Sequence, residues 1–112
     1  MADTVVGEAK IVNLEIHKEA ALSFDIEWWD DSVPPQAIPI SAIAARLRVE
    51  DTIYDLDELG YATWAENVIS ISLPDTFTAT LEAKPGRWRL AATDAIGEES
   101  RVLARGSVRI RS

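Results

Sequence analysis

The chain has 112 residues, a size typical of one domain, and contains no cysteine, which excludes a disulfide framework and thiolate metal sites. Its hydrophobic fraction of 47% is high enough to form a core, so intrinsic disorder is not expected. The net charge of −8 disfavours nucleic-acid binding, and no apolar run is long enough to span a membrane.

The N-terminal residues precede the first patterned segment. We expect residues 1–112 to form a single domain, with residues 1–9 as an extended N-terminal arm. The start of the chain lacks a basic region followed by an apolar region, so we expect no secretory signal. Because an extended arm exposes unpaired backbone groups, residues 7–10 are a candidate contact for other copies of the protein.

Apolar and polar residues alternate with a period of two through most of the chain, a pattern typical of strands with one buried and one exposed face. The alternating runs are residues 10–17, 21–29, 45–50, 68–74, 87–92 and 106–111. Their spacing predicts an all-β fold, either an antiparallel β-sandwich or a barrel. Trp28 and Trp88 fall on the apolar side of this alternation, so we expect both rings in the core.

Two breaks between the runs predict long loops. Residues 30–39 contain three of the five prolines and predict an extended loop or an edge segment, because proline cannot donate to a sheet ladder. Residues 56–67 predict a long excursion between strands that turns at Gly60.

Two later breaks carry more specific signals. Residues 76–83, with Asp75 as the N-cap, predict one short helical turn before the penultimate hairpin, which Pro85 and Gly86 end. Residues 93–99 predict a hairpin turn in which Gly97 takes a positive φ.

Basic residues are concentrated near the C-terminus. Residues 1–83 carry 16 acidic and 4 basic side chains, whereas residues 84–112 carry 3 acidic and 7 basic ones. The arginines alternate with apolar residues, which predicts one basic sheet face. The candidate interface arginines are Arg87, Arg89, Arg105, Arg109 and Arg111.

Two interpretations of this basic face remain open. It is either a solvated face with weak ion pairs to acidic residues on other strands, or a charge-complementary contact with further copies or a neighbouring protein. The acidic residues expected on other strands are Asp25, Glu27 and Glu50.

Three aromatic residues do not fit the buried pattern, namely Trp29, Tyr61 and Trp64. Exposed rings on loops are typical of protein interfaces and of sugar-stacking platforms. The alternative is a lid packed over one open end of the sandwich. All three are therefore candidate interface residues.

No motif for catalysis or metal binding is present. His17, the single histidine, lies on the polar side of a predicted strand, so we expect a surface residue rather than a catalytic base or zinc ligand. The acidic pairs and triplets near residues 30–31 and 55–58 lack the EF-hand spacing, which favours solvated loops over calcium. We expect no enzymatic activity, no cofactor and no metal.

Between Leu22 and Ile110, a tryptophan-containing strand leads through a proline loop into "ARLRV". A distinctive C-terminal pattern follows, formed by Thr80, Leu81, Pro85, Gly86, Trp88, Leu90, Asp94, Gly97, Arg101, Leu103, Gly106, Val108 and Ile110. This order of features resembles the small immunoglobulin-like domains of tailed-bacteriophage virion proteins, among them the N-terminal domain of upper baseplate proteins and short minor tail or neck proteins. The chain departs from the pattern at Ala42 or Ile43, one of which stands where a glycine is expected, and in the turn after Asp31, which lacks glycine and contains Pro34–Pro35.

The resemblance implies an immunoglobulin-like antiparallel β-sandwich with a structural role in a virion, made in the bacterial host cytoplasm. Its partners would be other virion proteins and copies of itself in a symmetric assembly, with no nucleic acid and no membrane. A tail, baseplate or neck component is the first interpretation. A capsid decoration or minor capsid protein of the same fold is the alternative, and a carbohydrate-binding module is a further one.

Overall fold

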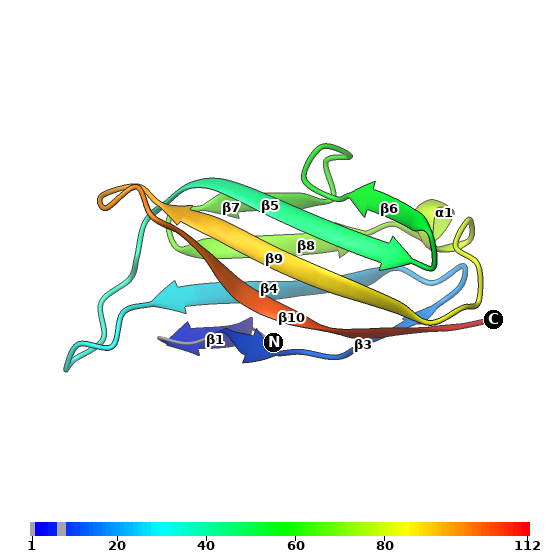
Figure 1. Ribbon diagram of the computed structural model, residues 1–112, viewed down its shortest axis with the longest axis horizontal. Coiled ribbons are helices and arrows are strands. Elements are labelled where there is room, and N and C mark those ends of the chain that lie inside the picture. Colours follow the sequence, from blue (N-terminus) through cyan, green and yellow to red (C-terminus); the bar gives the residue numbers. More distant parts are fainter. Residues whose placement is uncertain (1, 7–8) are drawn as a thin grey trace.

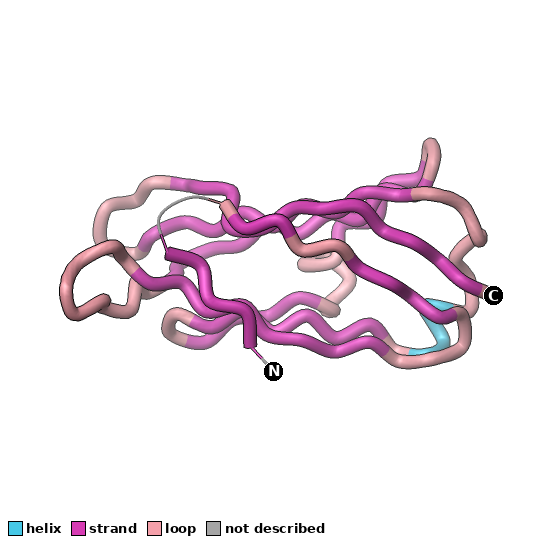
Figure 2. Tube along the Cα trace, turned by 90° about the horizontal axis from the view of Figure 1, so that it is seen from below, coloured by secondary structure: helices cyan, strands magenta, loops and turns pink. Residues whose placement is uncertain are grey.

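The computed structural model describes residues 2–6 and 9–112 and consists of two β-sheets packed face to face (Figures 1 and 2). The four-stranded sheet has the order β1 (Ala2–Val6), β4 (Leu22–Trp29), β8 (Val68–Leu73) and β7 (Ala62–Ala65). The six-stranded sheet has the order β2 (Lys10–Ile11), β10 (Ser100–Arg111), β9 (Gly86–Asp94), β5 (Ile40–Val49) and β6 (Thr52–Asp55), and β3 (Leu14–His17) also pairs with β10. The predicted all-β sandwich is confirmed.

The strand order follows the immunoglobulin pattern, in which one sheet joins the second, fifth and fourth strands and the other joins the third, sixth and seventh. Here β4, β8 and β7 form the first set, and β5, β9 and β10 form the second. The expectation of purely antiparallel pairing is wrong for the N-terminal strands, since β1 runs parallel to β4, and β2 and β3 run parallel to β10. No tight turn joins these strands to their partners, so no hairpin forces them to be antiparallel.

The N-terminal segment contributes to both sheets. Residues 2–6 of the expected arm form β1, and Val5 is buried there. Residues 1, 7 and 8 of that arm lie outside the described residues. The predicted contact segment 7–10 is therefore described only from residue 9, and β2 begins at Lys10.

The core lies between the sheets and is built from the inward side of each alternating run. The largest fully buried side chains are Ile16, Ile26, Leu47, Ile69, Ile71, Leu73, Leu81, Leu90, Leu103, Val5 and Thr78. Trp28 and Trp88 are each 3% exposed, which confirms their predicted place in the core. The ring of Phe24 meets Trp88 edge to face at 5.6 Å between centroids, a favoured aromatic geometry.

The predicted excursion over residues 56–67 contains a strand that alternation did not reveal. Gly60 takes φ +84 at the expected turn, and the chain then pairs Ala62–Ala65 with β8 as β7. Only Ala62 in β7 is buried, so the strand has no period-two hydrophobic pattern to detect. Its conformation depends on the partner strand rather than on its own residues.

The predicted helix is present as a single turn, α1 (Asp75–Thr78), and it precedes the last hairpin, β9–β10, rather than the penultimate one. Pro74 holds the N-cap position, not Asp75, whose side chain accepts a hydrogen bond from the Thr76 amide. The helix is shorter than the predicted 76–83, because the Thr80 hydroxyl donates to the Phe77 carbonyl and competes with helix continuation.

The two remaining loop predictions have different outcomes. Residues 30–39 form an extended loop with one isolated bridge, between Trp29 and Ala37. In the β9–β10 turn the residue with a positive φ is Glu98, at +53, rather than Gly97. The carboxylate of Asp94 accepts a hydrogen bond from the Ile96 amide and thereby helps to set this turn.

Candidate functional site

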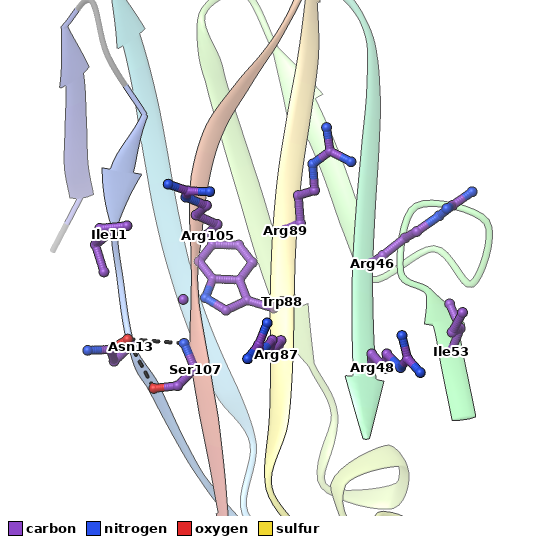
Figure 3. Close-up of a pocket in the computed structure, with 11 residues that line it drawn as sticks. Ile11, Asn13, Arg46, Arg48, Ile53, Arg87, Trp88, Arg89, Arg105 and Ser107 are labelled. Carbon is purple, nitrogen blue, oxygen red and sulfur yellow. Dashed lines mark hydrogen bonds between the residues drawn. The ribbon is translucent and has the colours of Figure 1, made fainter. Parts of the chain in front are cut away.

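Five arginine side chains gather on the outer face of β5, β9 and β10. We call this set the arginine face: Arg46 and Arg48 from β5, Arg87 and Arg89 from β9, and Arg105 from β10 (Figure 3). In the sheet register, Arg89 lies directly opposite both Arg46 and Arg105, and Arg87 lies directly opposite Arg48. Directly opposed residues have Cβ atoms about 4.5–5.5 Å apart, so five cationic side chains share a small area.

Local sequence explains why these arginines point outward. In β5 and β9 each arginine flanks a buried residue, Leu47 or Trp88. In β10 the register shifts between Val102 and Ala104, and both Leu103 and Ala104 are buried. This bulge changes the phase of the alternation, so that Arg105 faces the same side as Arg89.

Most of the positive charge on this face is not neutralised within the described residues. Arg46 forms an ion pair with Asp55 at 2.9 Å, and the Arg48 Nε donates to the Glu50 carbonyl at 2.8 Å. The side chains of the other three arginines make no ion pair or hydrogen bond within residues 2–6 and 9–112. These three are Arg87, Arg89 and Arg105. Like charges directly opposite one another destabilise a sheet, so this arrangement is unfavourable for folding alone.

An open groove of about 490 Å³ runs over the arginine face. Its lining includes two exposed isoleucines on the flanking strands, Ile11 of β2 and Ile53 of β6, which are 59% and 55% exposed (Figure 3). The groove thus combines cationic side chains with apolar flanks. Such a surface suits an acidic protein segment that also carries apolar side chains.

One side of the groove depends on the connection between β2 and β3. The Val12 carbonyl accepts a hydrogen bond from the Trp88 indole at 2.6 Å, and a Cβ at Gly106 would overlap that carbonyl oxygen. The Asn13 side chain accepts hydrogen bonds from the Ser107 amide at 3.0 Å and the Ser107 hydroxyl at 3.1 Å. These contacts attach the N-terminal strands to β10 beside the arginines.

The structure brings together only part of the predicted arginine set. Arg87, Arg89 and Arg105 belong to the arginine face, whereas Arg109 and Arg111 lie farther along β10, where its partner is β3. The remaining two members of the face, on β5, were not selected from the sequence. The signal that could have found them is the same alternation, which is visible in residues 45–50.

The acidic residues expected to pair with the basic face lie elsewhere. Asp25 and Glu27 are on β4 in the opposite sheet, and Glu50 forms an ion pair with Lys84 at 3.0 Å. Of the predicted interface arginines, Arg111 forms an ion pair, with Glu15 at 2.6 Å. Lys84 also forms an ion pair with Glu82. Both carboxylates raise the pKa of the Lys84 ammonium group, and Glu50 has the larger effect.

The three aromatic candidates do not form one platform. Trp29 is half-buried, and its indole donates to Glu27 at 3.2 Å. Tyr61 packs its ring against Phe77 at 4.9 Å, at the margin of the core. Trp64 is the most exposed of the three at 43%, and its indole donates to the Ile40 carbonyl at 3.1 Å.

A second hollow, of about 290 Å³, lies where the 30–39 loop meets the β9–β10 turn. Asp30, Asp31, Asp94 and Glu99 are among the residues that line it. Hydrogen bonds from the Ser32 hydroxyl and from the Gln36 and Ser32 amides lower the pKa of the Asp30 carboxyl group. These bonds hold the loop in an ordered turn at neutral pH.

The structure describes no group of three histidine or carboxylate side chains, in residues 2–6 and 9–112, that could hold a metal ion. His17 is exposed, with its Nε2 atom 3.3 Å from Glu15. In the same part of the chain, no helix has the length and apolar character needed to cross a membrane.

Comparisons with known proteins add one structural similarity. No protein-family model matches the chain, and no curated protein matches it. Among solved structures, the chain is similar to the N-terminal domain of ORF48 of phage TP901-1, with a TM-score of 0.47 and 7% sequence identity over 100% of each chain. This level of similarity does not establish a shared fold, so the fold and the arginine face rest on the chain's own residues.

Proposed function

We propose that this chain is a non-enzymatic structural protein of a bacteriophage virion, a tail, baseplate or neck component that acts through protein–protein contacts. The phage context comes from the resemblance of residues 22–110 to the immunoglobulin-like domains of virion proteins. The observation that carries the protein-contact role is the arginine face, where three of the five arginines have no ion-pair or hydrogen-bond partner within the described chain.

The chemistry of the face favours a protein partner. Arginine presents a planar fork of donors that matches carboxylates, and arginine is enriched in protein interfaces. Three side chains of the face are available for such contacts, on two adjacent strands: Arg87, Arg89 and Arg105. The chain's net charge of −8 opposes long polyanions such as nucleic acids outside this patch.

Labelling of purified virions tests the proposal. Antibodies against the protein, detected by electron microscopy, are expected to mark the tail, baseplate or neck. Labelling of the head surface would instead support the capsid decoration alternative, and absence of the protein from particles would refute a virion role.

A charge reversal tests whether the arginine face carries the contact. The double variant with Arg89→Glu and Arg105→Glu is expected to be incorporated into particles poorly. The matched control is Arg109→Glu, an exposed arginine on the same strand outside the face. Equal incorporation of the two variants would remove the arginine face from the proposal.

A further inference from the structure

One end of the sandwich has the opposite character to the arginine face. The 30–39 loop and the β9–β10 turn both lie at this end, at the left of Figure 1, and residues of both line one hollow. We call its carboxylates the acidic end: Asp30, Asp31, Asp94, Glu98 and Glu99. The same two loops carry the most exposed large apolar side chains of the described residues, Val33 at 98% and Ile96 at 83%.

Hydrogen bonds order the two loops of the acidic end, and two of its carboxylates have no partner within the described residues. Asp30 and Asp94 accept backbone amide hydrogen bonds within their own turns, which holds both loops in shape. In the described part of the chain, the side chains of Asp31 and Glu98 have no hydrogen-bond or ion-pair partner. Among residues 2–6 and 9–112, the one cation that contacts the cluster is Arg101, which meets Glu99 at 3.5 Å.

The two surfaces are complementary in charge and in apolar content. The arginine face offers unpaired guanidinium groups flanked by Ile11 and Ile53. The acidic end offers unpaired carboxylates beside Val33 and Ile96. The cations of one surface thus match the carboxylates of the other, and such charge complementarity sets orientation and register in protein interfaces.

We propose that the acidic end of one copy docks into the groove of the arginine face of a second copy. This inference names the partner in the protein contacts proposed above, and it rests on that proposed function. The contact is heterologous, because it joins two different surfaces of the same chain. Each added copy leaves one groove and one acidic end free, so the assembly grows until a ring closes or a filament forms.

The dimensions of the two surfaces agree. The shorter extents of the molecule are 23 and 22 Å, which bound the area of the acidic end. Five neighbouring strands span about 24 Å across the six-stranded sheet. A contact of this size buries about 500 Å² on each copy, or about 1,000 Å² in total, near the lower limit for a specific interface.

A small, charged contact has two consequences. A single contact is weak, and closure of a ring adds stability because the last contact forms within one assembly. Salt weakens the association, since the opposed charges are exposed and screened. Self-association is therefore expected at high protein concentration and low ionic strength.

A nucleic acid is the less favoured occupant of the groove. Single-stranded nucleic acids are usually held by exposed aromatic rings next to cations. The groove is instead flanked by isoleucines, and its one aromatic residue, Trp88, is 3% exposed. The acidic remainder of the chain would repel the phosphates on either side of the patch.

The test is a charge swap between two variants of the full chain. The face-reversed variant carries Arg89→Glu and Arg105→Glu, and the end-reversed variant carries Asp31→Lys and Glu98→Lys. Native mass spectrometry and light scattering are expected to find multimers of the natural protein and monomers of each variant alone. Each reversal should weaken association by about tenfold or more, as for loss of close interfacial charge pairs.

The decisive arm is an equimolar mixture of the two variants. Their reversed surfaces are again complementary, and the unreversed pair retains the natural contact, so assembly is expected to return. A control variant carries Arg109→Glu and Glu58→Lys, which reverse one basic and one acidic side chain at exposed positions outside both surfaces. This control should assemble like the natural protein. Circular dichroism establishes that each variant folds, and a salt titration of the natural protein gives a second readout without mutation.

Three results would overturn the contact. They are a natural protein that stays monomeric at all concentrations, folded variants that fail to assemble when mixed, and a monomer whose arginine face binds duplex DNA. The virion labelling experiment separates this inference from the proposed function. A monomer that is labelled in the tail refutes the self-contact alone, whereas a self-associating protein absent from particles refutes the virion role.

Discussion

The Trp88 indole joins the core to the N-terminal strands, and its removal has a calculable cost. In a Trp88→Phe variant the Val12 carbonyl loses its 2.6 Å hydrogen bond. An acceptor left unsatisfied in this part-buried position costs about 1–3 kcal/mol. The smaller ring also leaves a void, and a void the size of a methyl group costs about 1 kcal/mol. The expected loss in the free energy of unfolding is therefore about 2–4 kcal/mol.

Urea unfolding followed by far-ultraviolet circular dichroism measures this loss. With a denaturant slope of about 2 kcal/mol/M, in the middle of the range for small proteins, the urea midpoint should fall by about 1–2 M. This is a large part of the total stability of a small domain, which is about 5–15 kcal/mol.

Trp64→Phe is the matched control. Trp64 also donates its indole N–H to a backbone carbonyl, that of Ile40 at 3.1 Å, but its side chain is 43% exposed where Trp88 is 3% exposed. Water can replace the lost donor at an exposed site, so the control should lose only about 0.5–1 kcal/mol. Equal midpoints for the two variants would refute the view that the buried Trp88 holds the N-terminal strands through its hydrogen bond to Val12.

Three further predictions follow from individual contacts. Gly106→Ala should destabilise the protein by about 1–3 kcal/mol, because the new Cβ overlaps the Val12 carbonyl oxygen; an unchanged urea midpoint would contradict this. Thr78→Val should cost about 1–2 kcal/mol, since the buried hydroxyl donates to the Ala20 carbonyl at 2.9 Å; a thermal unfolding midpoint equal to that of the natural protein would count against it. In an NMR titration Asp30 should show a pKa below its ordinary value, owing to the Ser32 hydroxyl and neighbouring amides. A lowered folded-state pKa means that the loop's stabilisation is present at neutral pH and lost as the pH falls through that pKa, so a midpoint at or above the ordinary value would be the contrary result.

The acidic end illustrates what pattern alone does not reveal. Asp30 and Asp31 lie in a proline loop, whereas Asp94, Glu98 and Glu99 lie in a hairpin turn more than half the chain away. Each group taken by itself predicts a solvated loop. Their common place at one end of the molecule depends on how β4 in one sheet and β9 in the other are stacked.

The arginine face shows, within one sheet, which features local sequence predicts and which depend on strand pairing. Alternation correctly turns the four arginines of β5 and β9 outward, because the side-chain period of a strand is local. The outward direction of Arg105 depends on the bulge in β10. Which arginines become neighbours depends on register. The pairing of Arg89 with Arg46 and with Arg105 requires both the β5–β9 alignment and the bulge in β10, whereas Arg109 lies beyond the end of β9.

The sequence by itself therefore determined the class of fold, the core positions of Trp28 and Trp88, and the outward direction of the arginines in β5 and β9. These follow from hydrophobic periodicity and turn chemistry, which act over a few neighbouring residues. Only the tertiary structure decided the parallel N-terminal strands, the strand Ala62–Ala65, and the joining of charges into two opposed surfaces. These depend on pairing between distant segments, where the partner's position, rather than the segment's own composition, selects the conformation.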